Sequence, residues 1–259
     1  MELSFDTCPW SRFLPATFSF WEQSRCAWVS EPANTWSNLA YIFVGIYLLI
    51  INRKIRWSPV KFFAWISILV GICSGLYHAS GTFMFQCADL ASMFLVVTLM
   101  LTLNLRRAGW IRPPSVYFVF WGDFGLSMGI LLNFQRTGRA IFIVLLILAL
   151  SIEAYQYMTG SNYAIKPLIT ALAILGVSFV FWQLDLKGVL ARPDNHYFQA
   201  HAVWHVVNSI SFFYLYKFYE QFEMLSPRRL RLIREARSTA TEWLYGRLIR
   251  ESSESKDFA

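Results

Sequence analysis

The sequence predicts an all-α integral membrane protein, a bundle of seven transmembrane helices with an exterior or lumenal N-terminus and a cytoplasmic C-terminus. The first observation is composition, because 56% of the 259 residues are hydrophobic and 15% are charged, which is too apolar for a soluble domain. The second is that the apolar residues come in runs of about 20, long enough for a helix to cross a bilayer. The third is the uneven placement of arginine and lysine between these runs.

Three regions follow one another along the chain. Residues 1–34 are polar to mixed, lack the pattern of a signal peptide and form a predicted exterior segment. Residues 35–220 form the predicted membrane domain, with spans at 35–52, 59–80, 88–105, 114–133, 140–158, 165–184 and 199–220. Residues 221–259 alternate arginine with apolar residues before a polar end, which predicts a basic amphipathic tail on the cytoplasmic surface.

The basic residues of the short loops predict the orientation. Basic clusters follow the first predicted span at 52–56, the third at Arg106 and Arg107, and the seventh in the tail. All three lie on one side of a seven-span bundle, and basic residues concentrate on the cytoplasmic side. Arg136 and Arg139 lie on the opposite side and are outnumbered. The net charge of +7 therefore indicates membrane topology and attraction to anionic lipid, with no nucleic-acid partner.

Two of the four cysteines, Cys8 and Cys26, lie in the N-terminal segment, which faces an oxidising compartment in this orientation. They could form a disulfide there. Two cysteines without a wider framework leave the pairing open. Cys73 and Cys87 lie in or near spans two and three, and the sequence contains no C-x-x-C pair.

Three of the four histidines are the most informative residues, because His78, His201 and His205 lie in or at the ends of strongly apolar segments. An ionisable group at membrane depth is costly and marks a candidate functional site. His201 and His205 are four residues apart, so both rings project from one helix face, as in metal-binding H-E-x-x-H helices, here without the glutamate. His78 would complete a catalytic type of zinc site. The plainer alternative is unrelated core histidines bonded to backbone carbonyls.

The predicted topology brings three of these chemical groups to one membrane depth. His78 ends span two, Asp89 opens span three and His201 opens span seven. In a seven-span bundle all three points lie on the N-terminal, exterior side. This agreement is independent of any motif and favours a single site.

Two polar residues are candidate catalytic groups. Asp89 could offset the charge of a divalent metal, orient the attacking water and accept its proton; the alternative is a helix N-cap. Ser74 lies one turn before His78 and could donate to the oxyanion of the substrate; the alternative is a bond to a carbonyl one turn back. Asp185 and Gln199 are further candidates for partners of a histidine.

Other polar residues are predicted to have no catalytic part. Asp123 and Glu153 lie inside spans four and five, where they are expected to pair with interior polar groups. His196 lies in a polar loop and is predicted to be a surface histidine.

At these positions the chain resembles the CREST superfamily of seven-span membrane hydrolases. The shared pattern is S-x-x-x-H closing span two, an aspartate eleven residues on, and H-x-x-x-H in span seven. Within the superfamily the chain is most similar to the alkaline ceramidases, on a glutamate followed by N-T-x-S-N (residues 31 and 34–38), F-W-x-x-D (181–185) and Q-x-H-A-x-W-H (199–205). The resemblance covers about residues 30–220.

The N-terminal segment departs from that family. Alkaline ceramidases carry acidic residues there that bind calcium near the active site. In the best alignment Phe20, Gln23 and Arg25 stand where the family has an aspartate, a glutamate and an asparagine. Because calcium prefers several oxygen ligands, calcium is not expected in this chain. Arg25 could instead pair with Glu22 or Glu31 and tie the segment to the bundle.

The resemblance implies a zinc-dependent intramembrane amidohydrolase that cleaves the N-acyl bond of a ceramide-like lipid. His78, His201 and His205 would hold Zn²⁺, Asp89 would move the proton and Ser74 would help to hold the oxyanion. One alternative is another lipid amide or ester hydrolase of the same superfamily. The other is a metal-binding seven-span receptor or transporter, which the placement of the chemistry at one membrane face disfavours.

Overall fold

The computed structural model describes residues 8–53, 59–160 and 163–223. In these ranges the regular elements are helices, apart from one isolated bridge between Pro15 and Thr82. The contacts divide the chain into two units, Met1–Phe218 and Tyr219–Ala259. The helical bundle lies in the first unit. Nearly all of the predicted amphipathic tail, from residue 224 on, lies outside the described residues.

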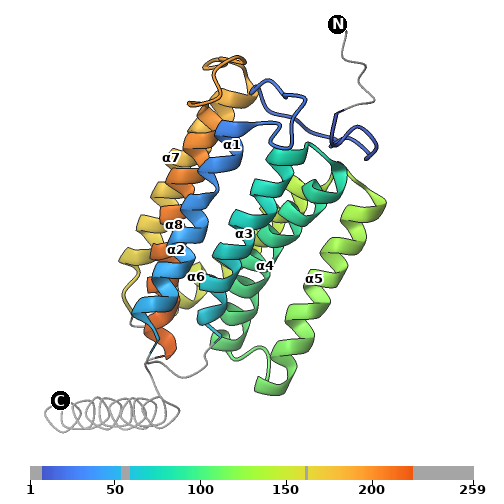
Figure 1. Ribbon diagram of the computed structural model, residues 1–259. Coiled ribbons are helices and arrows are strands. Elements are labelled where there is room, and N and C mark those ends of the chain that lie inside the picture. Colours follow the sequence, from blue (N-terminus) through green and yellow to red (C-terminus); the bar gives the residue numbers. More distant parts are fainter. Residues whose placement is uncertain (1–7, 54–58, 161–162, 224–259) are drawn as a thin grey trace, which may run out of the picture. The chain divides into compact units, whose positions relative to one another are not determined.

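The helices follow one another along the chain and run lengthwise through the bundle (Figure 1). In the described ranges they are α1 (Pro32–Ser37), α2 (Leu39–Ile51), α3 (Lys61–Ser80), α4 (Phe83–Ala108), the short 3-10 helix η2 (Pro113–Ser115), α5 (Val116–Asn133), α6 (Gly138–Met158), α7 (Lys166–Leu186) and α8 (Ala200–Glu223).

The prediction of a multi-pass membrane protein is confirmed. Six stretches of the described chain are long and apolar enough to cross a bilayer, and α1 and α2 together form the first of them, Pro32–Ile51. They match the first six predicted spans, except that α4 begins at Phe83 rather than near residue 88. α8 has 24 residues but is less apolar, because it carries His201, His205 and Asn208. The seventh span is therefore treated below as a proposal.

Two glycines let α2 and α3 pack closely. A Cβ atom on Gly71 would lie 2.6 Å from Ile42 Cγ1 and 2.8 Å from the carbonyl oxygen of Asn38. A Cβ atom on Gly45 would lie 2.6 Å from the carbonyl oxygen of Ala64. Small residues are the usual means by which membrane helices bring their backbones together. The close approach holds α3, which carries Ser74 and His78, against the first span.

Several polar groups within the bundle are paired, which lowers the cost of placing them in a low dielectric. Arg107 Nη1 donates to Glu153 Oε2 over 2.7 Å, and Tyr163 donates to the same carboxylate. Burial, with help from Glu153, raises the pKa of Tyr163 to about 12, so the hydroxyl keeps its proton. In α4, Thr98 Oγ1 donates to Asp123 over 2.6 Å. The prediction that Asp123 and Glu153 pair with interior polar groups is confirmed.

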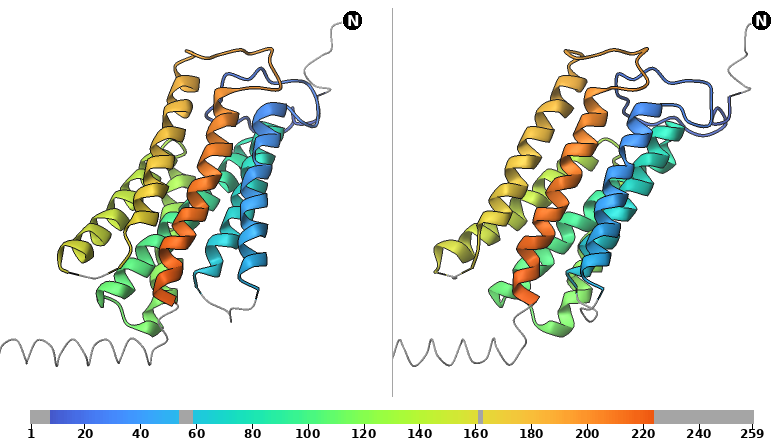
Figure 2. Two further views of the ribbon diagram at one scale, coloured as in Figure 1. Left: turned by 90° about the vertical axis from the view of Figure 1, so that its left-hand side faces the viewer. Right: turned by 60° about the vertical axis from the view of Figure 1, so that its left-hand side comes forward.

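Residues 8–31, here called the strap, cross the end of the bundle at which α3 ends and α4 begins (Figures 1 and 2). A disulfide joins Cys8 to Cys26 and settles the pairing that the sequence left open. Backbone hydrogen bonds fix the strap to the α3–α4 turn, from Ala16 N to Gly81 O at 2.9 Å and from Phe83 N to Leu14 O at 2.8 Å. The strap therefore covers the end of the bundle that was predicted to carry the site.

The close packing of α2 on α3 can be tested with Gly71→Ala. The added methyl group would press on the backbone of α2, so we expect destabilisation of about 1–3 kcal/mol, the usual range for overpacking. Thermal unfolding of the detergent-solubilised protein measures this. Gly125→Ala is the matched control, because nothing lies within 4 Å of its added Cβ atom. Equal melting temperatures for the two variants would contradict the packing argument.

Candidate metal centre

Three buried histidines meet at the strap end of the bundle. His78 lies in the last turn of α3, and His201 and His205 lie in the first two turns of α8. Each offers one ring nitrogen, and these three nitrogens lie within 4.8 Å of one another. Each of these residues is only 2–3% exposed. The structure thus brings together the three histidines that the sequence singled out.

A carboxylate fixes the orientation of His78. Its Nδ1 lies 2.7 Å from Glu31 Oε2, and both groups are buried. Because a carboxylate only accepts hydrogen bonds, the proton is on Nδ1. The Nε2 lone pair then faces His201 Nε2, 3.2 Å away. A carboxylate behind a histidine is a common arrangement in metal sites, where it holds the ring and raises its basicity.

α1 fixes His205 in a similar way. The Ser37 hydroxyl lies 2.8 Å from His205 Nδ1 and donates its own proton to the carbonyl oxygen of Asn34. Asn38 Nδ2 also contacts His205 Nδ1, over 3.2 Å. Two side chains of the first span therefore hold the His205 ring through its Nδ1 atom. Neither Ser37 nor its role was predicted, since a serine in a span-entry motif has no distinctive spacing to a histidine at residue 205.

His201 is held by an aromatic ring and by the position of its backbone. The ring of Phe20 in the strap stacks on it with centroids 3.4 Å apart. Asp185, at the end of α7, interacts with the backbone N–H groups of His201 and Trp21. Within the described residues, His201 Nδ1 and Asp185 Oδ1 are buried without a hydrogen-bond partner. Asp185 therefore contacts the backbone of His201 and not its ring, whereas the sequence had suggested a partner of a histidine side chain.

The donor set fits a divalent metal. His78 Nε2 lies 3.2 Å from His201 Nε2, and the lone pair on His78 Nε2 faces that ring. Three imidazole nitrogens are the protein part of a catalytic zinc site, and their second nitrogens are bonded elsewhere in such sites. Here that is so for His78 and His205. The cluster could therefore hold a metal ion.

Asp89 and Ser74 lie beside His78. Asp89 is in the second turn of α4, and the N-cap of that helix is Thr82, so the alternative of an aspartate N-cap is wrong. The Asp89 carboxylate interacts with the Ser74 hydroxyl and lies near His78. Ser74 itself is 4% exposed. The two candidate catalytic groups are thus in contact with each other at the edge of the histidine cluster.

The strap also corrects one expectation. Arg25 is exposed and does not serve as the ionic partner of Glu22 or Glu31. Glu31 pairs with His78, and Glu22 pairs with His196 over 3.1 Å. The error arose because pairing was inferred from opposite charge, whereas the carboxylates are buried and reach partners that are far away in the sequence. His196 is likewise not a plain surface histidine.

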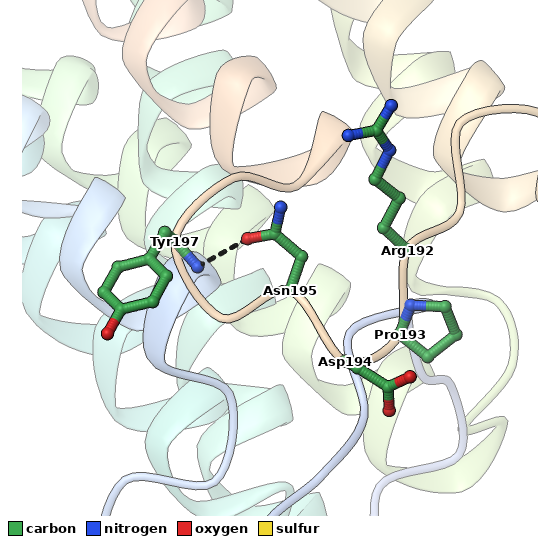
Figure 3. A pocket seen from close by; sticks show the side chains of 5 residues that line it. All are labelled: Arg192, Pro193, Asp194, Asn195 and Tyr197. Atoms are coloured by element: carbon green, nitrogen blue, oxygen red, sulfur yellow. Dashed lines mark hydrogen bonds between the residues drawn. The ribbon is translucent and has the colours of Figure 1, made fainter.

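The loop between α7 and α8 forms a pocket of ≈ 430 Å³, and its lining includes none of His78, His201 and His205 (Figure 3). It is lined by Arg192, Pro193, Asp194, Asn195 and Tyr197. Asn195 Oδ1 accepts from the backbone N–H groups of Tyr197 and Phe198 over 3.0 and 2.9 Å, so the loop is held by its own side chains. The lining contains none of the predicted site residues.

Comparison with known proteins gives a match that covers the residues of this site. The family model described as Ceramidase matches residues 24–234, which include the strap end, the histidine cluster and Asp89. Human alkaline ceramidase 1 is 23% identical over 205 residues, which cover 72% of this chain and 74% of the relative.

Metal analysis tests the cluster directly. We expect purified protein to carry one zinc ion per chain and His201→Ala to lose most of it, because two imidazoles and a water bind far more weakly than three imidazoles. The measurement is elemental analysis after extensive dialysis. Tyr197→Ala, at an exposed residue of the neighbouring loop, is the control and should keep the metal. Unchanged zinc content in His201→Ala would remove His201 from the site.

Proposed function

The chain belongs to the ceramidase family, and from that membership we propose that it hydrolyses the N-acyl amide bond of a ceramide-like lipid. The products would be a sphingoid base and a fatty acid. The observation that carries the proposal is the buried three-histidine cluster with Asp89 and Ser74 beside it, at one end of a membrane bundle. A lipid amide has its reactive group near the membrane surface and its chains in the apolar layer, which suits a site at that depth.

His78, His201 and His205 would hold the metal, proposed to be zinc. Zinc bound there would polarise the amide carbonyl and make the attacking water more acidic. Glu31 would keep His78 in the tautomer that presents Nε2, and Ser37 and Asn38 would hold the ring of His205. The protein would thereby supply a rigid ligand set that needs no rearrangement during the reaction.

Asp89 would transfer the proton. As water oxygen bonds to the amide carbon, Asp89 would accept a proton from that water, and it would return it to nitrogen as the C–N bond breaks. The Ser74 hydroxyl would first donate a hydrogen bond to the ionised carboxylate of Asp89. Once Asp89 is protonated, the Ser74 hydroxyl would be free to turn to the substrate oxygen, which carries negative charge at that moment. The contact between the two side chains supports this sequence of events.

We also propose the full seven-span topology, with the strap exterior or lumenal and the C-terminus cytoplasmic. α8 has the length for a seventh span, and its histidines face the interior of the bundle. The Cys8–Cys26 disulfide supports an exterior strap, because disulfides persist in oxidising compartments. Arg106 and Arg107 at the end of α4 support a cytoplasmic opposite side.

The first prediction for this function concerns Asp89→Asn. It should keep zinc but lower turnover of ceramide about 10²-fold or more, because an amide cannot accept the proton. Release of sphingoid base from a panel of lipid amides and esters measures the activity and the substrate class together. Asp123→Asn is the matched control, a carboxylate in another span that only accepts from Thr98, and it should stay near wild type. Wild-type turnover in Asp89→Asn would exclude Asp89 as the base.

The second prediction is that hydrolysis does not require calcium. Phe20 stacks on His201 and Arg25 is exposed, so neither offers an oxygen ligand near the site. Activity should survive a calcium-selective chelator at a concentration that leaves the zinc content unchanged. Adding calcium back should have no effect. A reproducible rise in activity with calcium would contradict the prediction.

A further inference from the structure

Glu22 lies in the strap, and its carboxylate is buried. The residue is 2% exposed, and both of its oxygens accept hydrogen bonds. Oε1 accepts from the backbone N–H of Ala33 and Oε2 from that of Asn34, each over 2.9 Å. Oε1 also lies 3.1 Å from His196 Nδ1, which must be the donor. A buried carboxylate with three donors is a fixed point, because moving it would leave charge unpaired.

We infer that Glu22 and His196 are positioning residues of the metal centre. The Glu22–His196 pair, here called the clamp, sets the orientation of the three histidines without contacting them. The inference rests on the proposed metal-dependent function. The clamp joins the strap, α1 and the α7–α8 loop, three segments that are distant in the sequence. Each of the three leads directly to a group that contacts the histidine cluster.

Through α1 the clamp reaches His78. Glu22 bonds the backbone of Asn34, and the side chain of Asn34 donates to Glu31 Oε2 over 3.0 Å. That same oxygen accepts from His78 Nδ1. Asn34 is fully buried, so this path is closed to solvent. A shift of α1 would therefore change the hydrogen bond that orients His78.

α1 transmits the same position to His205. The carbonyl oxygen of Asn34 accepts from Ser37 Oγ over 2.9 Å and from Asn38 Nδ2 over 2.8 Å. Both side chains contact His205 Nδ1, at 2.8 and 3.2 Å respectively. Asn34 is thus bonded on its N–H side to Glu22 and on its carbonyl side to the partners of His205. One residue couples the clamp to two rings.

The α7–α8 loop connects the clamp to His201. Asn195 stabilises the turn that presents His196, as Figure 3 shows for its bond to Tyr197 N. Gln199 Nε2 donates to the carbonyl oxygens of Arg192 and Asn195, which ties the loop to the start of α8. His201 lies two residues after Gln199. On the strap side, Phe20 lies two residues before Glu22 and stacks on His201.

The experiment compares Glu22→Gln and His196→Gln in the full-length protein, both close to isosteric. In Glu22→Gln one backbone N–H would face an amide NH₂ group. We expect zinc to dissociate into a competing chelator about 10-fold faster, the lower end of the effect of residues that orient metal ligands. Cobalt-substituted protein should show an altered visible absorption spectrum, which a change of stability alone would not produce. Amide exchange at residues 33 and 34 should also be faster.

The matched controls are Gln23→Ala and Tyr197→Ala, the exposed neighbours of the two clamp residues, which should resemble wild type in every readout. Zinc release and the cobalt spectrum are measured without lipid, so they are independent of hydrolysis. A wild-type protein that holds zinc but cleaves no ceramide would overturn the proposed function and leave this inference intact. Wild-type zinc release and cobalt spectrum in both glutamine variants would overturn the inference, even with a lower melting temperature. His196→Gln keeps the inference testable if Glu22→Gln does not fold.

Discussion

The structure of the site depends on one constraint, that three imidazole rings are held facing one another inside a low-dielectric bundle. A bond to the second ring nitrogen holds an imidazole in place, because otherwise its tautomer and orientation are free. His201 has no such bond among the described residues and is held by the stacked ring of Phe20. Glu31 occupies Nδ1 of His78 and Ser37 occupies Nδ1 of His205. Glu31 is the last residue of the strap and the N-cap of α1, and Ser37 is the last residue of α1. The role of α1 is therefore electrostatic as well as structural.

The membrane helices and the strap make different contributions to this constraint. α3 and α8 set the positions of the histidines, and Gly71 lets α3 approach α2 closely enough for Glu31 and α1 to reach His78. The strap covers the ring of His201 with Phe20 and is held in place by a disulfide, backbone bonds to the α3–α4 turn and Glu22. Water exclusion strengthens each electrostatic contact beneath it.

The sequence predicts features that repeat with the period of a helix or that are energetically costly in a membrane. The spans were predicted because apolar runs must match the bilayer, and His201 and His205 because their spacing puts them on one helix face. His78 and Asp89 were placed nearby by counting spans. The clamp could not be found in this way, since Glu22 and His196 are 174 residues apart and nothing local marks them as partners. The same limit explains the wrong pairing of Arg25, and the Cys8–Cys26 disulfide also needed the fold to decide it.

The distribution of unsatisfied polar atoms separates this end of the bundle from the rest. Buried polar atoms are usually paired, and at the opposite end Arg107, Glu153 and Tyr163 satisfy one another. Among the described residues, six buried side-chain atoms have no hydrogen-bond partner, and five of them belong to residues that contact or adjoin the histidine cluster: Asn34, Asn38, Asp185, Gln199 and His201. Only Thr102 lies elsewhere. Unpaired polar atoms are thus concentrated around the three imidazoles, among the residues that the structure describes. Because an unpaired buried polar group is costly, this concentration supports the proposal that a cation and polar reactants bind at the strap end.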